Sequence, residues 1–497
     1  MRATQSLGGT DKRPDGEGFR LKWAFVRLWR SPTATTWGSL AVRLAGVLVV
    51  LPVVLVRFAP ADVALWQLFT TLFTLALLLD FGLAPTFTRL LAFARGGASI
   101  ADMADMRRRE DGPAERGDAV VVAVFATLRW LYPRLGLAVV VLFAAFGTAA
   151  LRVPVAQTAD SEAAWLAWAF VLGSSAVGLW GGAYSAALQG MDSIARMRRW
   201  EVATGLAQIA CSIAVLALGG GLLALVVAYQ AWVVVGAVRN RLLLQSIHPE
   251  LFTSPPSADA RVLAVMWPPT WRSGLGVLMS SGVIQLSGVV YSQMAPAAEV
   301  AAYLLALRLM TLISQFCQAP YYSKLPGLAR LYASGDTVNQ LRLAQRGMRF
   351  AYWVFVGGAL AAALLATPLL GLIGSRTPFV APGVWALMSL AFFAERAGAM
   401  HLQLYSLTNH IVWHIANGVT GTIVVVLAVL GYRWWGSYAF PAAMLLAYAG
   451  FYCVYSMAHT RKAFNLRIWS FESRAALPAA AALCIGLGLA LAFPLRF

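Results

Sequence analysis

Charged side chains are scarce in this sequence: Asp, Glu, Lys and Arg make up 12% of its 497 residues, whereas a soluble domain has about 25%. Hydrophobic residues make up 60%, against about 45–50% in a soluble domain. The longest polar stretches are residues 1–35 and 95–118, too short for a domain of their own. The composition therefore predicts an all-α polytopic membrane protein and excludes a large soluble domain.

The sequence also lacks the short motifs of common enzymes. It has no HExxH, no phosphate-binding loop ending in lysine and no GxSxG element. We therefore expect a transporter and not an enzyme, with no catalytic residues, no metal site and no cofactor. Because no nucleotide site is recognisable, uphill transport would use an H+ or Na+ gradient or the downstream consumption of the product.

The few cysteines show no pattern of a functional site. Their spacing fits neither a zinc site nor a disulfide, and each lies in its own apolar stretch. We expect them to be packing residues. They are Cys211, Cys317, Cys453 and Cys484.

No cleavable signal peptide is expected, because about 35 mostly polar residues precede the first apolar run. Within this segment, residues 19–30 (FRLKWAFVRLWR) interleave aromatic and basic side chains. Such a pattern is typical of a helix that lies on an anionic membrane surface. A solvated basic tail is the alternative for residues 1–35.

Long apolar runs follow one another along the rest of the chain, and a spanning helix needs about 20 such residues. We expect about 12–14 transmembrane helices in total. The run at 62–92 is too long for one straight span, so it should tilt or break near Gly82 and Pro85. The expected spans are 37–58, 62–92, 131–151, 164–187, 200–217, 221–238, 265–291, 298–321, 350–373, 383–404, 410–431, 436–458 and 476–494.

The net charge of +18 is sorted by side of the membrane. Alternating helices place the basic segments, from the N-terminal tail to residues 461–474, on one side. The opposite side holds Arg57, Arg152, Arg376 and Arg433. This is the positive-inside pattern, which predicts a cytoplasmic N-terminus and no nucleic-acid partner. The loop near residue 409 is nearly uncharged, and an odd helix count would put the C-terminus outside.

The two halves of the chain resemble each other at a period of about 230 residues. The first and seventh spans each carry an arginine followed by glycine, Arg43 with Gly46 and Arg272 with Gly274. The chance likeness of apolar helices is the alternative. A parallel repeat predicts two six-helix lobes that rock about a central cavity and give alternating access. The expected units are 1–35, a basic tail; 36–243, the N-terminal lobe; 244–263, a cytoplasmic linker; 264–460, the C-terminal lobe; and 461–497, a basic loop with an extra helix.

Three arginines inside the expected spans are candidates for binding an anion, because a charge at mid-depth is costly unless it faces a cavity or a partner. Arg308 lies about ten residues into its span, near the midplane. Arg43 and Arg272 lie nearer the cytoplasmic face and could instead snorkel to lipid phosphates. Since the guanidinium fork suits phosphate, the three residues predict a cationic cavity for a phosphate or pyrophosphate.

Other buried charges are candidates for ion coupling or structural pairing. Asp80 could pair with Arg43 or Arg89, or titrate during transport. Glu395 and Arg396 are neighbours on one helix, so we expect them not to face each other and to need separate partners. One of the two should then point into the cavity.

Four short motifs lie in the first half of the chain: Arg43-x-x-Gly46, Trp66-Gln67-Leu68, Leu79-Asp80-Phe-Gly-Leu83 followed by Arg89, and Gln189-Gly190-Met-Asp192. Together they resemble the polysaccharide-transporter, O-antigen-flippase-like branch of the MOP exporter superfamily, over about residues 20–460. The resemblance implies a V-shaped pair of six-helix lobes that moves an undecaprenyl-pyrophosphate-linked oligosaccharide across the bacterial inner membrane for O-antigen or exopolysaccharide synthesis.

The same resemblance assigns roles to individual arginines. Related flippases use arginines on the first, second and eighth spans, and Arg43 and Arg308 match the first and the eighth. The second span offers only Arg89 at its end, and Arg272 depends on the repeat alone. This chain departs from the family pattern in two ways. Cys317 stands in the second half at the position that Asp80 has in the first half, and we expect one helix beyond the two six-helix lobes, where the family pattern has two.

Two other functions stay open at this point. An ion-coupled drug antiporter of the same superfamily would favour acidic residues in the cavity, whereas the spans here contain more arginine than acid. A membrane glycosyltransferase or polymerase would need larger outer loops. The expected partners are the lipid-linked glycan, membrane lipids and the polymerase and glycosyltransferases of the same pathway.

Overall fold

The computed structural model describes residues 32–96, 100, 117–408 and 412–492. Within these ranges the chain is helical and contains no strand, which confirms the all-α prediction. Nine stretches of the described residues are long and apolar enough to cross a membrane. The chain is thus a multi-pass membrane protein. The expected surface helix at 19–30 lies outside the described residues.

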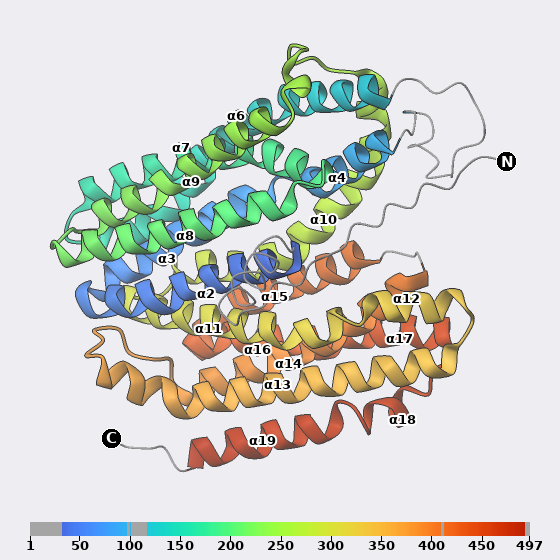
Figure 1. Ribbon diagram of the computed structural model, residues 1–497. Helices are drawn as coiled ribbons and strands as arrows, with labels where there is room; N and C mark the ends of the chain where they lie inside the picture. Colours follow the sequence, from blue (N-terminus) through green and yellow to red (C-terminus); the bar gives the residue numbers. More distant parts are fainter. Residues whose placement is uncertain (1–31, 97–99, 101–116, 409–411, 493–497) are drawn as a thin grey trace, which may run out of the picture.

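The first group of helices covers the N-terminal half of the chain and forms the upper layer in Figure 1. In this N-terminal lobe, α7 packs against α6 and α9, and α2 packs along α8. Its elements are α2 (Pro32–Arg57), α3 (Pro60–Leu78), α4 (Leu83–Arg95), α6 (Gly117–Ala156), α7 (Ser161–Gly190), α8 (Ile194–Ala217) and α9 (Leu222–Ile247).

The second group repeats this arrangement and forms most of the lower layer of Figure 1, while α10 begins beside the N-terminal lobe, where it packs against α4 and α6. In this C-terminal lobe, α10 packs along α15 as α2 packs along α8, and α14 packs on α16 and α17 as α7 packs on α9. Its elements are α10 (Ala260–Tyr291), α11 (Ala297–Tyr322), α12 (Leu325–Ala333), α13 (Thr337–Leu372), α14 (Pro382–Tyr405), α15 (Trp413–Trp435), α16 (Ala439–Ala447) and α17 (Cys453–Phe464).

Short elements connect and extend the lobes. A 3-10 turn (Pro249–Phe252) lies between α9 and α10, so the non-α connection covers residues 248–259 and is shorter than the expected 244–263. After α17, the short helix α18 (Ile468–Glu472) leads to α19 (Leu477–Ala492), which packs on α13 and α14 at the outer side of the C-terminal lobe.

Several helices are longer than the apolar runs that predicted them. Helix α6 covers residues 117–156 and α13 covers 337–372, where hydropathy indicated 131–151 and 350–373. Hydropathy detects only the part of a helix that lipid tails surround, and a polar extension beyond that part is invisible to it. Asp259 and Asp336 cap α10 and α13 outside the spans, and hydrogen bonds from Arg261 and Asn339, respectively, lower the pKa of each carboxyl.

The long run at 62–92 breaks as predicted, between α3 and α4. Phe81 and Gly82 have φ angles of 50° and 75°, in the left-handed region that favours glycine. The Asp80 carboxylate accepts a hydrogen bond from the Ala84 backbone N–H (2.9 Å) and so stabilises the start of α4. Gly274 on α10 lies directly against this turn, and a Cβ added there would clash with the Phe81 carbonyl oxygen.

The two lobes contact each other mainly through α3, which packs against α10 and α11. Polar contacts close the end of this interface where α3, α7 and α11 begin. The buried Gln67 side chain donates to the Ala301 carbonyl (3.3 Å), Gln293 donates to the Ala150 carbonyl (2.6 Å), and Gln157 accepts from the Ala297 N–H (2.7 Å). Towards the other end, on the side where α4 ends and α10 begins, the layers in Figure 1 diverge.

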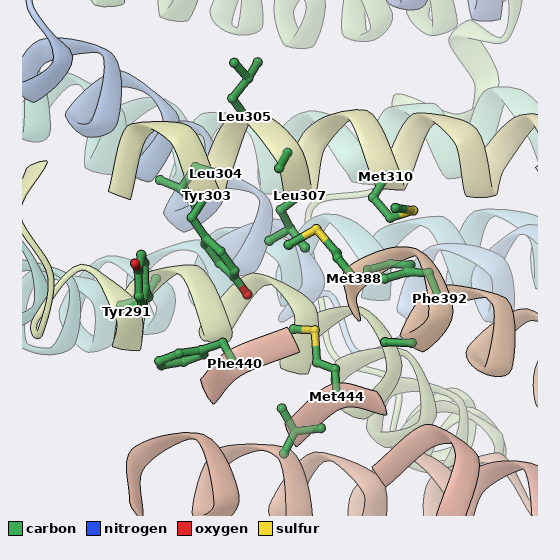
Figure 2. Packing of buried hydrophobic residues seen from close by; sticks show 14 of the residues in the cluster. Tyr291, Tyr303, Leu304, Leu305, Leu307, Met310, Met388, Phe392, Phe440 and Met444 are labelled. Carbon is green, nitrogen blue, oxygen red and sulfur yellow. The ribbon is translucent and has the colours of Figure 1, made fainter. Parts of the chain in front are cut away.

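The core of the C-terminal lobe is filled by large side chains. Figure 2 shows Tyr291, Tyr303, Phe440 and Met444 packed between α10, α11 and α16, close to Met388 of α14. The ring centroids of Tyr291 and Tyr303 are 4.7 Å apart, and those of Tyr291 and Phe440 are 5.1 Å apart. Aromatic pairs at such distances stabilise a core beyond their buried area. Side chains therefore fill the space between these helices.

Candidate functional site

A cavity of about 590 Å³ opens inside the N-terminal lobe, between α2, α3, α7, α8 and α9. Arg308 of α11 reaches into it from the C-terminal lobe. Glu201 and Ser212 both line it from α8, and their spacing of eleven residues corresponds to about 16 Å along a helix. The cavity is thus an elongated channel that follows α8.

Glycines make room for this cavity. Gly178, Gly181, Gly182, Gly205 and Gly236 all line it. At Gly181 an added Cβ would lie 2.6 Å from the Ala237 Cβ, so this glycine also allows α7 and α9 to approach each other closely. At Gly236 nothing lies within 4 Å of the added Cβ, because that position faces open space.

Arg308 lies at the inner part of the cavity. Its guanidinium carbon is 5.3 Å from the centroid of the Trp66 ring, within the range of a cation–π contact. Trp66 is buried and belongs to α3, so this contact also joins the two lobes. The aromatic face supports the charge without neutralising it, which leaves the guanidinium N–H groups able to bind an anion.

Arg43 and Glu201 lie at the mouth of the same cavity. Nη2 of Arg43 on α2 is 3.6 Å from Oε2 of Glu201 on α8. Nη1 of Arg198 is only 2.7 Å from the same carboxylate oxygen. The Arg43 side chain is 68% exposed, so most of its guanidinium is available to a ligand. The structure therefore brings Arg43 and Arg308 to one cavity.

Arg239 is a third cavity arginine, and the sequence analysis placed it in a loop. It lies within α9, because this helix continues to Ile247 and does not end near residue 238. Its guanidinium donates to the Thr204 hydroxyl (2.6 Å) and to the Asn240 side-chain oxygen (2.7 Å), which are both neutral. Among the described lining residues, the bases are thus Arg43, Arg239 and Arg308, and the one acid is Glu201.

The remaining predicted arginines and Asp80 lie elsewhere. Arg272 belongs to α10, but its side chain is outside the described residues. Arg89 is exposed on α4 and is not among the residues that line the cavity. Asp80 forms an ion pair with neither Arg43 nor Arg89, since its carboxylate caps α4 instead. Of the two alternatives for Asp80, the structure does not show the pairing with Arg43 or Arg89, and titration during transport stays a prediction.

The expectation that Glu395 and Arg396 would need separate partners is wrong. Nη2 of Arg396 lies 2.9 Å from Oε2 of Glu395, and Nη1 donates to the Gln318 side-chain oxygen (3.0 Å). Neighbouring Cβ atoms on a helix point apart, but the long arginine side chain folds back far enough to reach the carboxylate. Neither residue lines the cavity in the N-terminal lobe.

A second buried pair was missed by the sequence analysis. Nε2 of His401 on α14 lies 2.8 Å from Oε1 of Glu472 on α18. The hydroxyl of Thr460 on α17 donates to the His401 carbonyl (3.0 Å). This network ties the segment before α19 to the core of the C-terminal lobe. Within the described residues, no group of three or more His, Cys, Asp or Glu side chains could hold a metal.

Solved structures resemble this chain over most of its length. An inward-facing multidrug resistance MATE family transporter of the MOP superfamily is 14% identical and covers 86% of this chain and 98% of its own (TM-score 0.69). The lipid II flippase MurJ, in an inward closed conformation, is 11% identical and covers 93% of both chains (TM-score 0.60). This chain has the fold of MOP superfamily transporters.

A third structure with this fold differs in the polarity of its pocket. It is a MOP superfamily transporter from Pyrococcus furiosus, described as having a binding pocket of reverse polarity that suggests a different function (TM-score 0.56). It is 13% identical to this chain and covers 90% of this chain and 98% of its own. No family model and no curated protein matches the sequence. Identities this low show a shared fold, and the substrate has to be argued from the cavity.

Proposed function

We propose that this protein is a flippase that moves an anionic polyprenyl-pyrophosphate-linked oligosaccharide across the bacterial inner membrane by alternating access. It has a cytoplasmic N-terminus and serves the synthesis of a surface polysaccharide. It acts as a transporter and not as an enzyme. The fold it shares with MOP superfamily transporters, a flippase among them, supports this class of function.

The observation that carries the proposal is the charge of the cavity. Arginines from three different helices, α2, α9 and α11, surround a space that contains one carboxylate. Arginine binds phosphate through a planar, permanently charged fork. A pyrophosphate bound in this cavity would contact arginines from both lobes, since Arg308 comes from the C-terminal lobe.

The size of the cavity limits how much of the substrate it encloses. At about 590 Å³, it is in the range of pockets that bind drug-sized molecules. The pyrophosphate and the first sugars fit such a space, and the polyprenyl chain remains in the lipid. The side chains of Thr204, Gln208 and Asn240 supply polar groups for the sugars.

The interface between the lobes supports alternating access. Hydrogen bonds of Gln67, Gln157 and Gln293 close one end of the interface, while Arg43, which lines the cavity, has a side chain that is largely exposed. Opening the other way requires these few interlobe hydrogen bonds to break. Their small number is compatible with two conformations that differ by a few kcal/mol.

A drug antiporter of the same superfamily is the second candidate. Two observations favour it: aromatic side chains such as Trp232 and Tyr229 line the cavity together with Glu201, and a multidrug transporter shares the fold with a TM-score of 0.69. A lipophilic cation would bind to aromatic faces and a carboxylate. The excess of arginine at the same cavity argues for an anion instead.

Replacement of Arg308 tests the proposal. In a strain that depends on this protein for a surface glycan, Arg308→Ala should reduce glycan export about 10- to 100-fold, because a hydrogen-bonded charge on phosphate is lost. Arg308→Lys should retain part of the export, since lysine keeps the charge without the fork. Arg89→Ala, on the exposed face of α4, is the matched control and should export normally.

Protein abundance is measured alongside export by immunoblot of the membrane fraction. Full export by the Arg308→Ala variant at normal abundance would refute the role of the cavity. Loss of resistance to lipophilic cations, with the glycan unaffected, would favour the drug antiporter.

A further inference from the structure

Glu201 is the acid at the mouth of an otherwise cationic cavity, and its surroundings are those of an anion-binding site. Arg43 contacts it from α2 and Arg198 from its own helix, while Arg239 of α9 lines the same cavity and donates to Thr204, three residues after Glu201 on α8. We propose that the Glu201 carboxylate is an internal competitor, which occupies the place of a substrate phosphate and is displaced when the substrate binds. The inference rests on the proposed function, because it assumes a phosphate cargo.

The contact that a substrate must break is weak. The distance between Arg43 Nη2 and Glu201 Oε2 is 3.6 Å, long for a charge-assisted hydrogen bond. The Arg43 side chain is 68% exposed, so water screens the pair. Partly exposed ion pairs of this kind stabilise a structure little. A pyrophosphate brings more negative charge and can bind the guanidinium through two oxygens, so it outcompetes the carboxylate.

The displaced carboxylate keeps a partner. Arg198 Nη1 lies 2.7 Å from Glu201 Oε2, and the two residues are three positions apart on α8, so their pairing does not depend on Arg43. A carboxylate that lost all its partners in this partly buried place would be costly. Because Arg198 stays paired with Glu201, this cost does not arise. Arg43 can therefore move from the Glu201 carboxylate to a substrate phosphate and back again.

Arg239 adds positive charge to the cavity from α9. Its hydrogen-bond partners Thr204 and Asn240 are neutral, and Glu201 is the acid that attracts it. Phosphate entering between α2 and α9 would therefore meet Arg43 and Arg239 together. While Glu201 is in place, its charge partly neutralises the arginines at the mouth of the empty cavity. Small anions of low charge therefore bind there less favourably than they would without Glu201.

Binding of pyrophosphate tests the inference directly. The full-length chain is placed in lipid nanodiscs and titrated with inorganic pyrophosphate and with geranylgeranyl pyrophosphate by calorimetry. Glu201→Gln, which keeps the shape and removes the charge, should bind both ligands about fivefold more tightly, the effect of removing one screened ion pair. Glu162→Gln removes one exposed acid at the start of α7 and is the matched control, expected to leave the affinity unchanged.

A double-mutant cycle shows whether the competition acts through Arg43. In an Arg43→Ala background, Glu201→Gln should give a clearly smaller gain in affinity, because the contested guanidinium is absent. Glu201→Asp, which is shorter but keeps the charge near Arg198, should give an intermediate gain and serves as a second variant if the glutamine variant does not fold.

The outcomes separate this inference from the proposed function. If the wild type binds pyrophosphate and Glu201→Gln binds it equally or less tightly, the competitor role is refuted while the flippase proposal stands. If neither the wild type nor the variant binds any pyrophosphate, both are refuted.

Discussion

The two lobes share one topology but differ in what their interiors contain. The N-terminal lobe encloses a cavity lined by glycines and by charged side chains that are open to ligands. The core of the C-terminal lobe is filled by fully buried aromatic residues, such as Trp385, Tyr352 and Phe392; Figure 2 shows Phe392. Repeated topology therefore fixes how the helices pack against one another, whereas the size of the side chains between them decides whether a lobe is hollow.

The charges follow the same division. In the N-terminal lobe Arg43 is largely exposed and its ion pair is long. In the C-terminal lobe the Arg396 side chain is 8% exposed, and that arginine is bound to Glu395 and Gln318. The charges of the first lobe that line the cavity are placed to bind a ligand, whereas Arg396 and Glu395 in the second lobe pair with each other away from that cavity. We infer that the C-terminal lobe acts mainly as a rigid body that contributes Arg308 to the site.

The largest expected effect is the loss of the buried pair in the C-terminal lobe. Arg396→Ala leaves Glu395, whose side chain is 16% exposed, without its cation, which costs up to about 3–5 kcal/mol, the value for a buried pair. We expect the thermal unfolding midpoint in detergent to fall sharply and the amount of monodisperse protein to drop. Glu395→Gln combined with Arg396→Gln should recover part of the stability, because no lone charge remains.

The N-terminal lobe offers the matched control for this variant. Arg239→Ala removes an arginine whose hydrogen-bond partners, Thr204 and Asn240, are neutral, and the loss of hydrogen bonds from a charged group costs about 1.5–3 kcal/mol. An equal loss of stability in both variants would contradict the division between a solid lobe and a hollow one.

An intermediate effect is expected at the His401–Glu472 pair. Glu472→Ala leaves the fully buried His401 ring without this partner, at a cost of about 1–3 kcal/mol. Because Glu472 belongs to the segment that leads to α19, limited proteolysis should cut the chain near α18 more readily. Glu472→Gln keeps a hydrogen-bonding group and should lose less.

Pyrophosphate affinity should stay unchanged in the Glu472→Ala variant, since the pair lies in the C-terminal lobe and does not line the cavity. A change in affinity as large as that of a cavity variant would show that the C-terminal lobe does more than support the site.

The sequence predicts the fold of this protein well for physical reasons. Apolar runs of spanning length mark most of the helices, and the Asp80-Phe-Gly82 turn marks the break between α3 and α4 correctly, because positive φ angles favour glycine. The ends of helices are harder to predict. In α9 the continuous apolar run ends near residue 238, whereas the helix continues to Ile247. The leucines at 242–244 are the feature of the sequence that indicates this continuation.

The site is less predictable, because it depends on side chains from distant segments. The apolar pattern marks Arg43 and Arg308 as buried charges, but it does not show that both line one cavity. Arg239 could not be recognised, because the predicted span ends at residue 238, directly before it. Glu201 has one feature that indicates a site, since it is an acid inside the expected span 200–217. The directions of neighbouring Cβ atoms on a helix predict no contact between Glu395 and Arg396. The arginine side chain is nevertheless long enough to fold back onto the carboxylate of its neighbour.

The smallest effect on stability, with a clear effect on transport, is expected from filling the cavity. Gly236 lines it, and Gly173 lies exposed on α7; an added Cβ meets nothing within 4 Å at either position. Gly236→Leu and Gly173→Leu should therefore both gain a little stability, up to about 1 kcal/mol, from the higher helix propensity of leucine. Only Gly236→Leu places a side chain in the path of the substrate, so glycan export should fall in this variant alone. Equal export by the two variants at equal abundance would mean that the substrate does not pass through the hollow lobe.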